Sequence, residues 1–229
     1  MKELISVLTD SKDSPLIAEK LLDVVERYAT CENTLAYLGD QILGSTERAN
    51  GYIHQLGFYK FVVANIDGTF PRRIRLHFWK KGEVKDDVHD HVASFASKVL
   101  YGSLINECFE HNGLGEAFIH KEFSARGESC HPEGFANSYA TLSLQSRTEM
   151  GPLTTYFQDY RQLHRAGPAT SEVVTLLVQD APNDRMINVF RERNFSSSDR
   201  SDTPMPMSVS QARNAYMQMR ALLGGAECK

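Results

Sequence analysis

The stretch GEVKDDVHDHVASFASKVLYG, residues 82–102, places His89 and His91 one residue apart, just ahead of a run rich in strand-forming residues. Alternate side chains of a β-strand face the same side, so the two imidazoles would project together from Cα atoms about 6.6 Å apart. Two neutral imidazoles that converge on one cavity suit iron, nickel, copper or zinc, whereas magnesium and calcium prefer oxygen ligands. The stretch therefore predicts a metal site, and a pair of solvated loop histidines is the alternative interpretation.

A third ligand must come from a distant strand, because two histidines bind a metal weakly. The best candidate is His164, at the end of the aromatic-rich run 154–164 (TTYFQDYRQLH), which precedes a Gly-Pro turn and the apolar run 173–178 (VVTLLV). In an antiparallel barrel a late strand returns beside an early one, which would bring His164 next to His89 and His91. The alternative is a histidine that is hydrogen-bonded at the end of a strand.

The composition is that of an ordinary globular protein, with 229 residues, 41% hydrophobic and 24% charged residues and a formal net charge of −4. No long block of Lys and Arg occurs, which argues against nucleic acid as a partner. The N-terminus lacks the apolar core of a signal peptide, and no run approaches the ~20 apolar residues of a membrane helix. We expect a soluble, cytoplasmic protein that binds a small molecule rather than nucleic acid or a membrane, and a homodimer is compatible with the sequence.

The chain divides into three parts: a helical N-terminal cover (1–50), a β-barrel (51–195), and a linker with a C-terminal helix that packs on the barrel (196–229). Residues 14–29 predict a helix with Ser14 as its N-cap, a Pro at the first helical position and apolar residues at helical spacing, and a weaker helical stretch covers 34–43. Near the C-terminus, Ser208 and Gln211 have the spacing of a capping box before a helix that Gly224 would end. The four cysteines form no CxxC pair, and we expect reduced thiols.

Between residues 57 and 190 the sequence consists of short apolar or alternating runs that Gly, Pro, Asn and Asp interrupt. About eight strands at this spacing predict an antiparallel sandwich or barrel. The runs are 58–66 (FYKFVVANI), 73–79 (RIRLHFW), 96–110 (ASKVLYGSLINECFE), 116–125 (EAFIHKEFSA), 138–146 (SYATLSLQS), 154–164, 173–180 (VVTLLVQD) and 186–192 (MINVFRE).

The first histidine motif, with Gly82, His89-Asp90-His91 and Gly102, resembles the first motif of the cupin superfamily. The segment 159–166 (DYRQLHRA), which a turn and the run 173–182 follow, is similar to the second cupin motif, which supplies the last histidine. Together the matched region covers about residues 57–190. The resemblance implies an all-β core, a double-stranded β-helix or jelly-roll barrel, that holds a metal ion on His89, His91 and His164 in its mouth.

Two departures from the cupin pattern shape the expected chemistry. The position of the usual Glu ligand, three or four residues after His91, carries no carboxylate, since Ser94, Phe95 and Ala96 follow there. The second motif lacks the usual Pro-x-Gly before its histidine. The site would thus be a three-histidine site, and His-Asp-His with the following VLYGSL resembles the cysteine-dioxygenase-like branch of the three-histidine thiol dioxygenases.

That resemblance implies a mononuclear Fe(II) dioxygenase or other oxygenase, with O₂ as co-substrate, acting on a small carboxylate- or thiol-bearing metabolite. Two alternatives stay open. One is a non-oxidative isomerase, lyase or hydrolase that uses Zn, Ni or Mn as a Lewis acid. The other is a non-catalytic cupin module that binds a small molecule, whose barrel mouth Phe95, Phe157 and Trp79 would pack shut.

The run 74–79 offers further site residues, because Arg75, His77 and Trp79 share one face of a strand. If this face lines the cavity, Arg75 would bind a substrate carboxylate, His77 would act as an acid or base, and Trp79 would form a wall. If it faces outward, Leu76 and Phe78 form ordinary core. The sequence leaves both arrangements open.

Other candidates come from neighbouring strands. Lys60 resembles, by its place, the carboxylate-binding Arg of the cysteine dioxygenases, and Phe95 would contact the substrate. Tyr160, four residues before His164 on the same expected strand, would hydrogen-bond a metal-bound ligand, whereas Tyr156 is expected to be barrel packing. Glu107 is a fallback fourth ligand. The remaining histidines are expected at the surface, although His120 could reach the cavity; they are His54, His111, His120 and His131.

Overall fold

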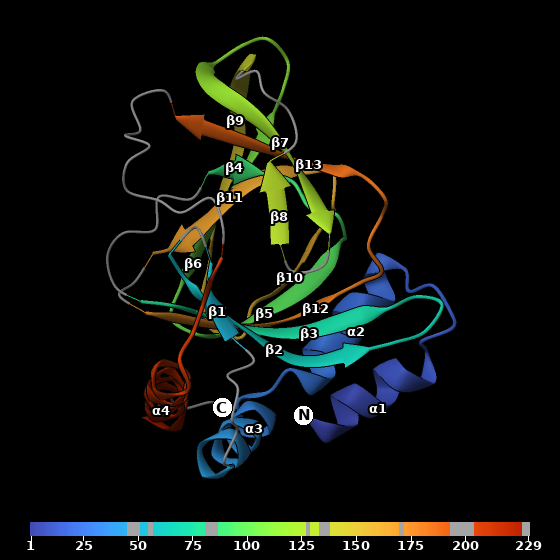
Figure 1. The fold of residues 1–229 in the computed structure, drawn as a ribbon, viewed down its shortest axis with the longest axis vertical. Helices are drawn as coiled ribbons and strands as arrows, with labels where there is room; N and C mark the ends of the chain where they lie inside the picture. Colours follow the sequence, from blue (N-terminus) through green and yellow to red (C-terminus); the bar gives the residue numbers. More distant parts are fainter. Residues whose placement is uncertain are drawn as a thin grey trace.

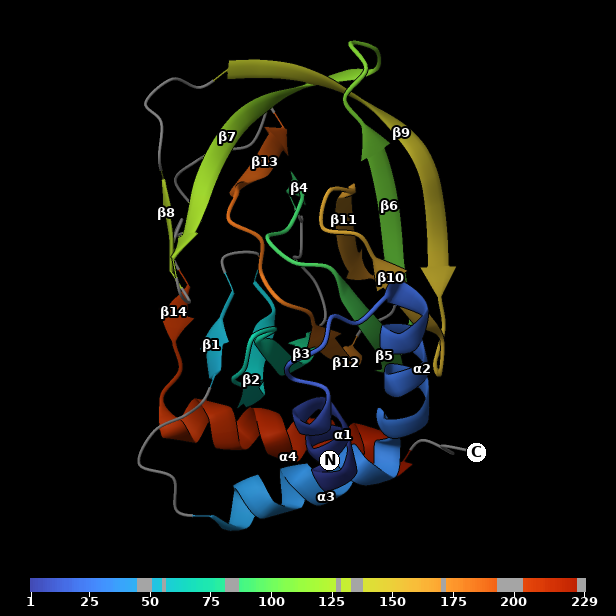
Figure 2. The ribbon, with the colours of Figure 1, turned by 90° about the vertical axis from the view of Figure 1, so that its right-hand side faces the viewer.

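A computed structural model describes residues 1–44, 51–54, 57–80, 87–126, 129–132, 138–169, 172–192 and 204–225. Two antiparallel sheets face each other, and four helices lie on the outer side of one of them (Figures 1 and 2). The helix-covered sheet has the order β10 (Thr155–Gln158), β5 (Phe95–Tyr101), β12 (Val173–Gln179), β3 (Arg72–Trp79), β2 (Tyr59–Ile66), β1 (Gly51–Ile53) and β14 (Met205–Pro206). The second sheet has the order β13 (Met186–Glu192), β4 (Val88–His89), β11 (Leu163–Pro168), β6 (Leu104–Glu110), β9 (Ser138–Met150), β7 (Glu116–Arg126) and β8 (Ser129–Pro132).

The strand order is that of a double-stranded β-helix. The strands β3, β4, β5 and β6 pass alternately through the two sheets, and β9, β10, β11 and β12 return in the same way beside them. This winding gives the neighbouring orders β10-β5-β12-β3 and β4-β11-β6-β9. The strands β7 and β8, which follow β6 in the sequence, lie beyond β9 in the sheet. The expected all-β jelly-roll core with flanking helices at both ends of the sequence is confirmed.

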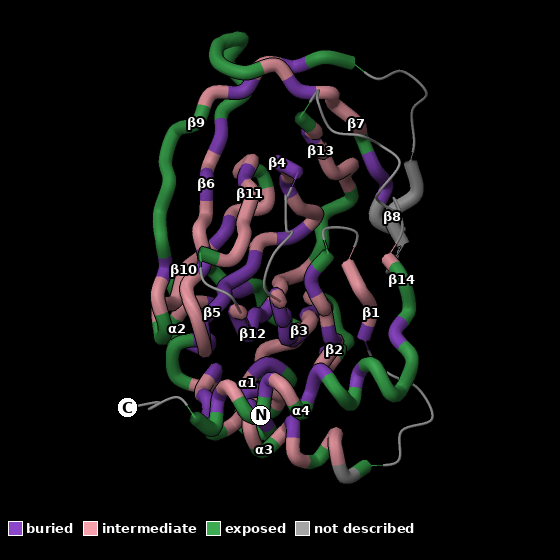
Figure 3. Tube along the Cα trace, turned by 90° about the vertical axis from the view of Figure 1, so that its left-hand side faces the viewer, coloured by how far each residue is buried: buried purple, intermediate pink, exposed green. Residues whose placement is uncertain are grey.

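The central strands of the helix-covered sheet are buried on both faces. Every residue of β5 from Phe95 to Leu100, and of β12 from Val173 to Val178, is buried (Figure 3). β12 is an almost continuous apolar run, VVTLLV, whereas β5 includes Lys98, whose Nζ pairs with Glu26 of α2 (Ala18–Tyr28) at 3.1 Å. Their outer face packs against the helices and their inner face lines the barrel interior, so this sheet forms the wall between the helical cover and the site.

The N-terminal cover consists of α1 (Lys2–Asp10), α2 (Ala18–Tyr28) and α3 (Cys31–Leu43). The helix predicted over 14–29 is present but begins at Ala18, with Ile17 at its N-cap. The predicted Ser cap is wrong because the Ser14 carbonyl oxygen accepts a hydrogen bond of 2.6 Å from the buried Arg72 guanidinium, which holds this segment against the barrel. The N-terminus of α3, by contrast, is capped: the Thr30 hydroxyl accepts a hydrogen bond from the Asn33 N–H at 3.1 Å.

The C-terminal helix α4 (Val209–Gly225) begins with the predicted capping box. The Ser208 Oγ accepts from the Gln211 N–H at 3.2 Å, and the Gln211 Oε1 accepts from the Ser208 N–H at 2.9 Å.

Cys31 is disulfide-bonded, so the expectation of reduced thiols is wrong for this residue. Within the described ranges, none of the helices combines the length and apolar character needed to cross a bilayer.

Candidate metal centre

The three predicted histidines come together inside the barrel. His89 ends β4, His91 lies two residues further on, and His164 pairs directly with His89 in the β4–β11 ladder. One ring nitrogen from each of the three lies within 4.8 Å of the others, and the Nε2 atoms of His91 and His164 are 2.8 Å apart. The three-histidine group can hold a metal ion.

Hydrogen bonds to two of the rings define which nitrogen faces the centre. The Nδ1 of His89 lies 2.8 Å from the Asp87 carbonyl oxygen, and the Nδ1 of His164 lies 2.7 Å from the Asn106 Oδ1. Both partners are acceptors, so each Nδ1 carries the hydrogen and each Nε2 keeps its lone pair. This arrangement, in which an outer acceptor orients a histidine, is the usual support of a metal ligand.

The protonation state also suits a metal site. Burial lowers the pKa of His91 and of His164 well below the ordinary histidine value, and the neighbouring His89 adds to the effect. Both imidazoles are therefore neutral near pH 7, which is the form that binds a metal.

The nearby carboxylates are bound elsewhere. Asp87 pairs with Arg191 at 2.9 Å and Asp90 with Arg185 at 2.5 Å. The prediction of Glu107 as a fallback ligand is wrong. Its carboxylate pairs with Arg147 at 3.2 Å and with Arg165. Glu107 lies opposite Arg165 in the β6–β11 ladder; because Arg165 is one residue from His164, Glu107 is on the other face of the sheet. Within the described part of the chain, the group that could hold a metal therefore consists of histidine nitrogens alone.

The structure shows which face of β3 lines the cavity. Arg75, His77 and Trp79 line the barrel cavity, whereas Leu76 and Phe78 belong to the core under the helices. Both faces of this strand are buried over residues 76–79, which is why alternation alone could not identify the inner one.

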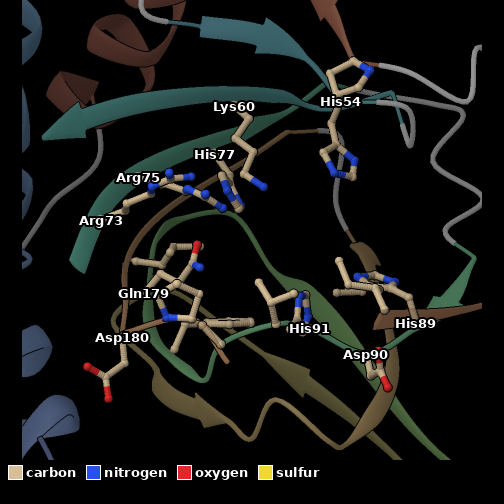
Figure 4. A pocket seen from close by; sticks show the side chains of 18 of the residues that line it. His54, Lys60, Arg73, Arg75, His77, His89, Asp90, His91, Gln179 and Asp180 are labelled. Carbon is tan, nitrogen blue, oxygen red and sulfur yellow. The ribbon is translucent and has the colours of Figure 1, made fainter. Parts of the chain in front are cut away.

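The cavity has a volume of about 520 Å³. Lys60, Arg75 and His77 lie on the wall across from His89 and His91 (Figure 4). Phe95 lines it too, with its ring centroid 5.1 Å from that of His91. At the end of β3 the Phe58 and Trp79 rings pack together with centroids 4.9 Å apart. The site thus combines a nitrogen-donor centre, a cationic wall and aromatic surfaces.

The cationic wall affects the histidine within it. Burial lowers the pKa of His77 well below its ordinary value, and the positive charges of Lys60 and Arg75 lower it further. The His77 Nε2 is buried and has no hydrogen-bond partner among the described residues. A neutral imidazole is therefore part of the cavity wall.

Tyr156 and Tyr160 lie in different surroundings, and Tyr156 packs against the cluster of Phe58 and Trp79 as expected. The run 154–164 is not one strand: β10 ends at Gln158, and a turn precedes β11, closed by the Asp159 side chain, which accepts from the Arg161 N–H at 2.9 Å. Tyr160 lies on this turn and does not line the described cavity. Tyr156, which we expected to be packing, does line it, and burial raises its pKa to about 12.

Among the histidines expected at the surface, His54 lines the cavity and stacks on Phe58 at 4.5 Å between ring centroids. His54 lies beside the cavity because β1 pairs with β2, and this pairing leaves no local signal in the sequence. His120 does not line the described cavity; its Nε2 lies 2.9 Å from the Asn188 Oδ1. Only the backbone of His131 is described, and Gly82 of the first motif lies outside the described residues.

No protein-family model matches the chain, and no curated protein matches it. Solved structures that match include a cupin superfamily protein from Desulfitobacterium hafniense, at 8% identity and TM-score 0.32, over 56% of this chain and 78% of that one. A structure of DMSP lyases matches at 16% identity and TM-score 0.39, over 73% and 75% of the two chains. Oxalate oxidase matches at 14% identity and TM-score 0.36, over 82% and 84%. At these levels the similarity carries no argument about function, and the fold assignment rests on the strand order.

Proposed function

We propose that this chain is a mononuclear non-haem iron enzyme that uses O₂ to oxidise a small carboxylate- or thiol-bearing molecule. The observation that carries the proposal is the convergence of three histidine nitrogens on a cavity, with the nearby carboxylates Asp87 and Asp90 held by arginines. Three neutral ligands would leave Fe(II) its double positive charge and up to three open positions, and the ion would supply redox chemistry with O₂.

The spacing of the donors is compatible with one shared ion. The Nε2 atoms of His91 and His164 are 2.8 Å apart. Two donors with metal–nitrogen bonds of about 2.1 Å lie at most about 4.2 Å apart. A pair of donors as far apart as the 4.8 Å limit of the set would therefore have to close by at least about 0.6 Å on binding.

The cavity walls give this chain's residues their proposed roles. Lys60 and Arg75 bind and orient the anionic group of the substrate, and the Arg75 guanidinium can pair with a carboxylate at two points. The aromatic rings of Trp79 and Phe95 contact the body of the substrate and exclude water. These roles support a substrate small enough for about 520 Å³ and negatively charged at one end.

Proton handling falls to His77 and Tyr156. His77 is neutral and lines the cavity, so we assign to it the proton taken from a substrate thiol or hydroxyl. Tyr156 keeps its proton at neutral pH, because its pKa is raised to about 12, and it therefore acts as a hydrogen-bond donor. The predicted catalytic role of Tyr160 is withdrawn in favour of Tyr156.

The proposal is tested by anaerobic loading of the metal-free protein with Fe(II), followed by an oxygen electrode and a panel of small carboxylates and aminothiols. We expect one iron per chain and oxygen uptake that depends on one class of acid. His89→Ala and His164→Ala should each abolish stoichiometric iron. Absence of bound metal in the wild type, or retention of metal in both variants, would refute the proposal.

One observation favours a second candidate, a non-oxidative metal enzyme. The same neutral nitrogen donors suit zinc, nickel or manganese, and His77 provides a neutral base beside the substrate. The metal content of protein purified without added metal, together with turnover in the absence of O₂, separates the two. A non-catalytic module with a closed mouth is not favoured, because Phe157 packs against the core under the helices and the cavity stays open.

A further inference from the structure

A buried carboxylate lies between the two neighbouring histidines of the centre. Asp90 is 2% exposed, and its side chain faces away from the cavity centre toward β13. Its oxygens accept hydrogen bonds from the Asn188 N–H at 2.8 Å and the Asn188 Nδ2 at 2.7 Å, and from the Arg185 Nη2 at 2.5 Å. We name this set, Asp90, Arg185 and Asn188, the Asp90 clasp.

The clasp lies just beyond the end of β4, which pairs with β13 on one side and with β11 on the other. Besides Asp90, the Arg185 guanidinium donates through Nη1 to two carbonyl oxygens, that of Tyr160 at 3.1 Å and that of His91 at 3.4 Å. The guanidinium also lies over the Tyr160 ring, 5.5 Å from its centroid. One side chain thereby links the His91 segment to the turn that leads into β11, the strand of His164.

His91 needs such support more than the other two ligands. His89 and His164 are held by direct pairing of β4 with β11, but β4 ends at His89 and His91 lies beyond it. The backbone of His91 is fixed by its N–H, which donates to the Tyr160 carbonyl oxygen at 3.0 Å, and by its carbonyl oxygen, which accepts from Arg185. Both bonds meet at the turn before β11.

We propose that Arg185 and Asp90 are positioning residues for the metal centre: they hold the His91 nitrogen at ligand distance from that of His164. This inference rests on the proposed metal site. The clasp turns Asp90 away from the centre, so that the alternation of the His-Asp-His motif presents two imidazoles to the ion and excludes the carboxylate between them. It acts on the geometry of the ligands and touches neither substrate nor metal.

The test compares the metal affinity and ligand geometry of four variants of the full chain with those of the wild type. Arg185→Ala removes the clasp. Arg185→Lys keeps the positive charge but not the planar guanidinium that donates to several acceptors at once, and Asp90→Asn removes the buried negative charge. Arg161→Ala is the matched control. Arg161 lies on the same turn, 5.2 Å from the centroid of the Tyr160 ring, but its hydrogen bonds are with Asp159 rather than with the His91 segment.

The readouts are Co(II) affinity by competition with a chelating dye, the visible spectrum of the Co(II) form, and the melting temperature of the metal-free protein. We expect Arg185→Ala to weaken Co(II) binding by roughly 10–100-fold and to alter the spectrum, with partial recovery in Arg185→Lys. Arg161→Ala should match the wild type in both. If Arg185→Ala does not fold, Arg185→Lys and Asp90→Asn must still show weaker binding and an altered spectrum.

Equal affinity and spectra in the wild type and the folded clasp variants would overturn the inference and leave the proposed function standing. A lower melting temperature of the metal-free protein with unchanged Co(II) spectrum and affinity would also overturn the inference, because it would show that the clasp stabilises the fold and does not position the ligands. A wild type that binds no metal would overturn both.

Discussion

Replacement of Asn106 by alanine should weaken metal binding, and the structure gives the size of the effect. The Asn106 Oδ1 accepts the Nδ1 hydrogen of His164 at 2.7 Å, and His164 is 3% exposed, so water cannot easily take over. In the metal-free variant the imidazole can move its hydrogen to Nε2 and donate to the His91 Nε2, 2.8 Å away. Metal binding forces the hydrogen back to Nδ1, where it has no acceptor. The penalty of a buried unsatisfied donor, about 1–3 kcal/mol, therefore falls on the bound state.

At 1.4 kcal/mol per tenfold change, that penalty corresponds to a loss of affinity of roughly 5- to 150-fold. The assay is competition for Zn(II) or Co(II) with a chelating dye, with Asn112→Ala as the control, since Asn112 is exposed and contacts Glu110 and Ser143. Asn106→Asp should bind at least as tightly as the wild type, because a carboxylate is a stronger acceptor. Unchanged affinity in Asn106→Ala would refute the assigned tautomer of His164.

Three further predictions concern stability and titration. Ser208→Ala removes a cap and should cost about 1 kcal/mol, or roughly 2–4 °C in melting temperature; an unchanged melting temperature would show that the capping box contributes nothing. Tyr156 should remain protonated at pH 11, so that ultraviolet titration of the metal-free wild type and of Tyr156→Phe gives the same phenolate yield at that pH; a larger yield in the wild type would contradict its pKa of about 12. Gly115→Ala should destabilise more than Gly113→Ala, since both glycines have positive φ, of 90° and 77°, but a Cβ on Gly115 would overlap the Leu142 backbone and one on Gly113 meets nothing within 4 Å. Equal urea midpoints for the two glycine variants would show that the predicted overlap of the added Cβ with the Leu142 backbone does not destabilise the protein.

The sequence is sufficient to predict the barrel and the three histidines, for a physical reason. The apolar run that forms β12 must be buried on both faces, and a histidine pair at strand spacing beside a late-strand histidine has few arrangements in an antiparallel barrel. Alternation also placed Arg75, His77 and Trp79 on one face. It could not identify the inner face, because the helices bury the outer one equally well.

The errors arise where local chemistry or long-range pairing overrides a strand-like pattern. The run 154–164 has strong strand propensity throughout, yet Asp159 closes a turn within it, and this removes Tyr160 from the cavity and brings in Tyr156. His54 and Asn106 acquire their places only through pairing of distant strands, so no local feature distinguishes them from surface residues. Glu107 faces the wrong side because the register of β6 with β11 sets it opposite Arg165.

The centre therefore draws on two kinds of support of different strength. His89 and His164 are placed by a ladder of backbone hydrogen bonds between β4 and β11, which the burial of the surrounding strands protects. His91 lies beyond that ladder and is placed by polar contacts that converge on Arg185, whose side chain is 25% exposed. We therefore expect a substitution of Arg185 to shift His91 more than the other two histidines. His91 is also nearer than His164 to Phe95, where the substrate is proposed to bind: its ring centroid lies 5.1 Å from that of Phe95, against 6.4 Å for His164.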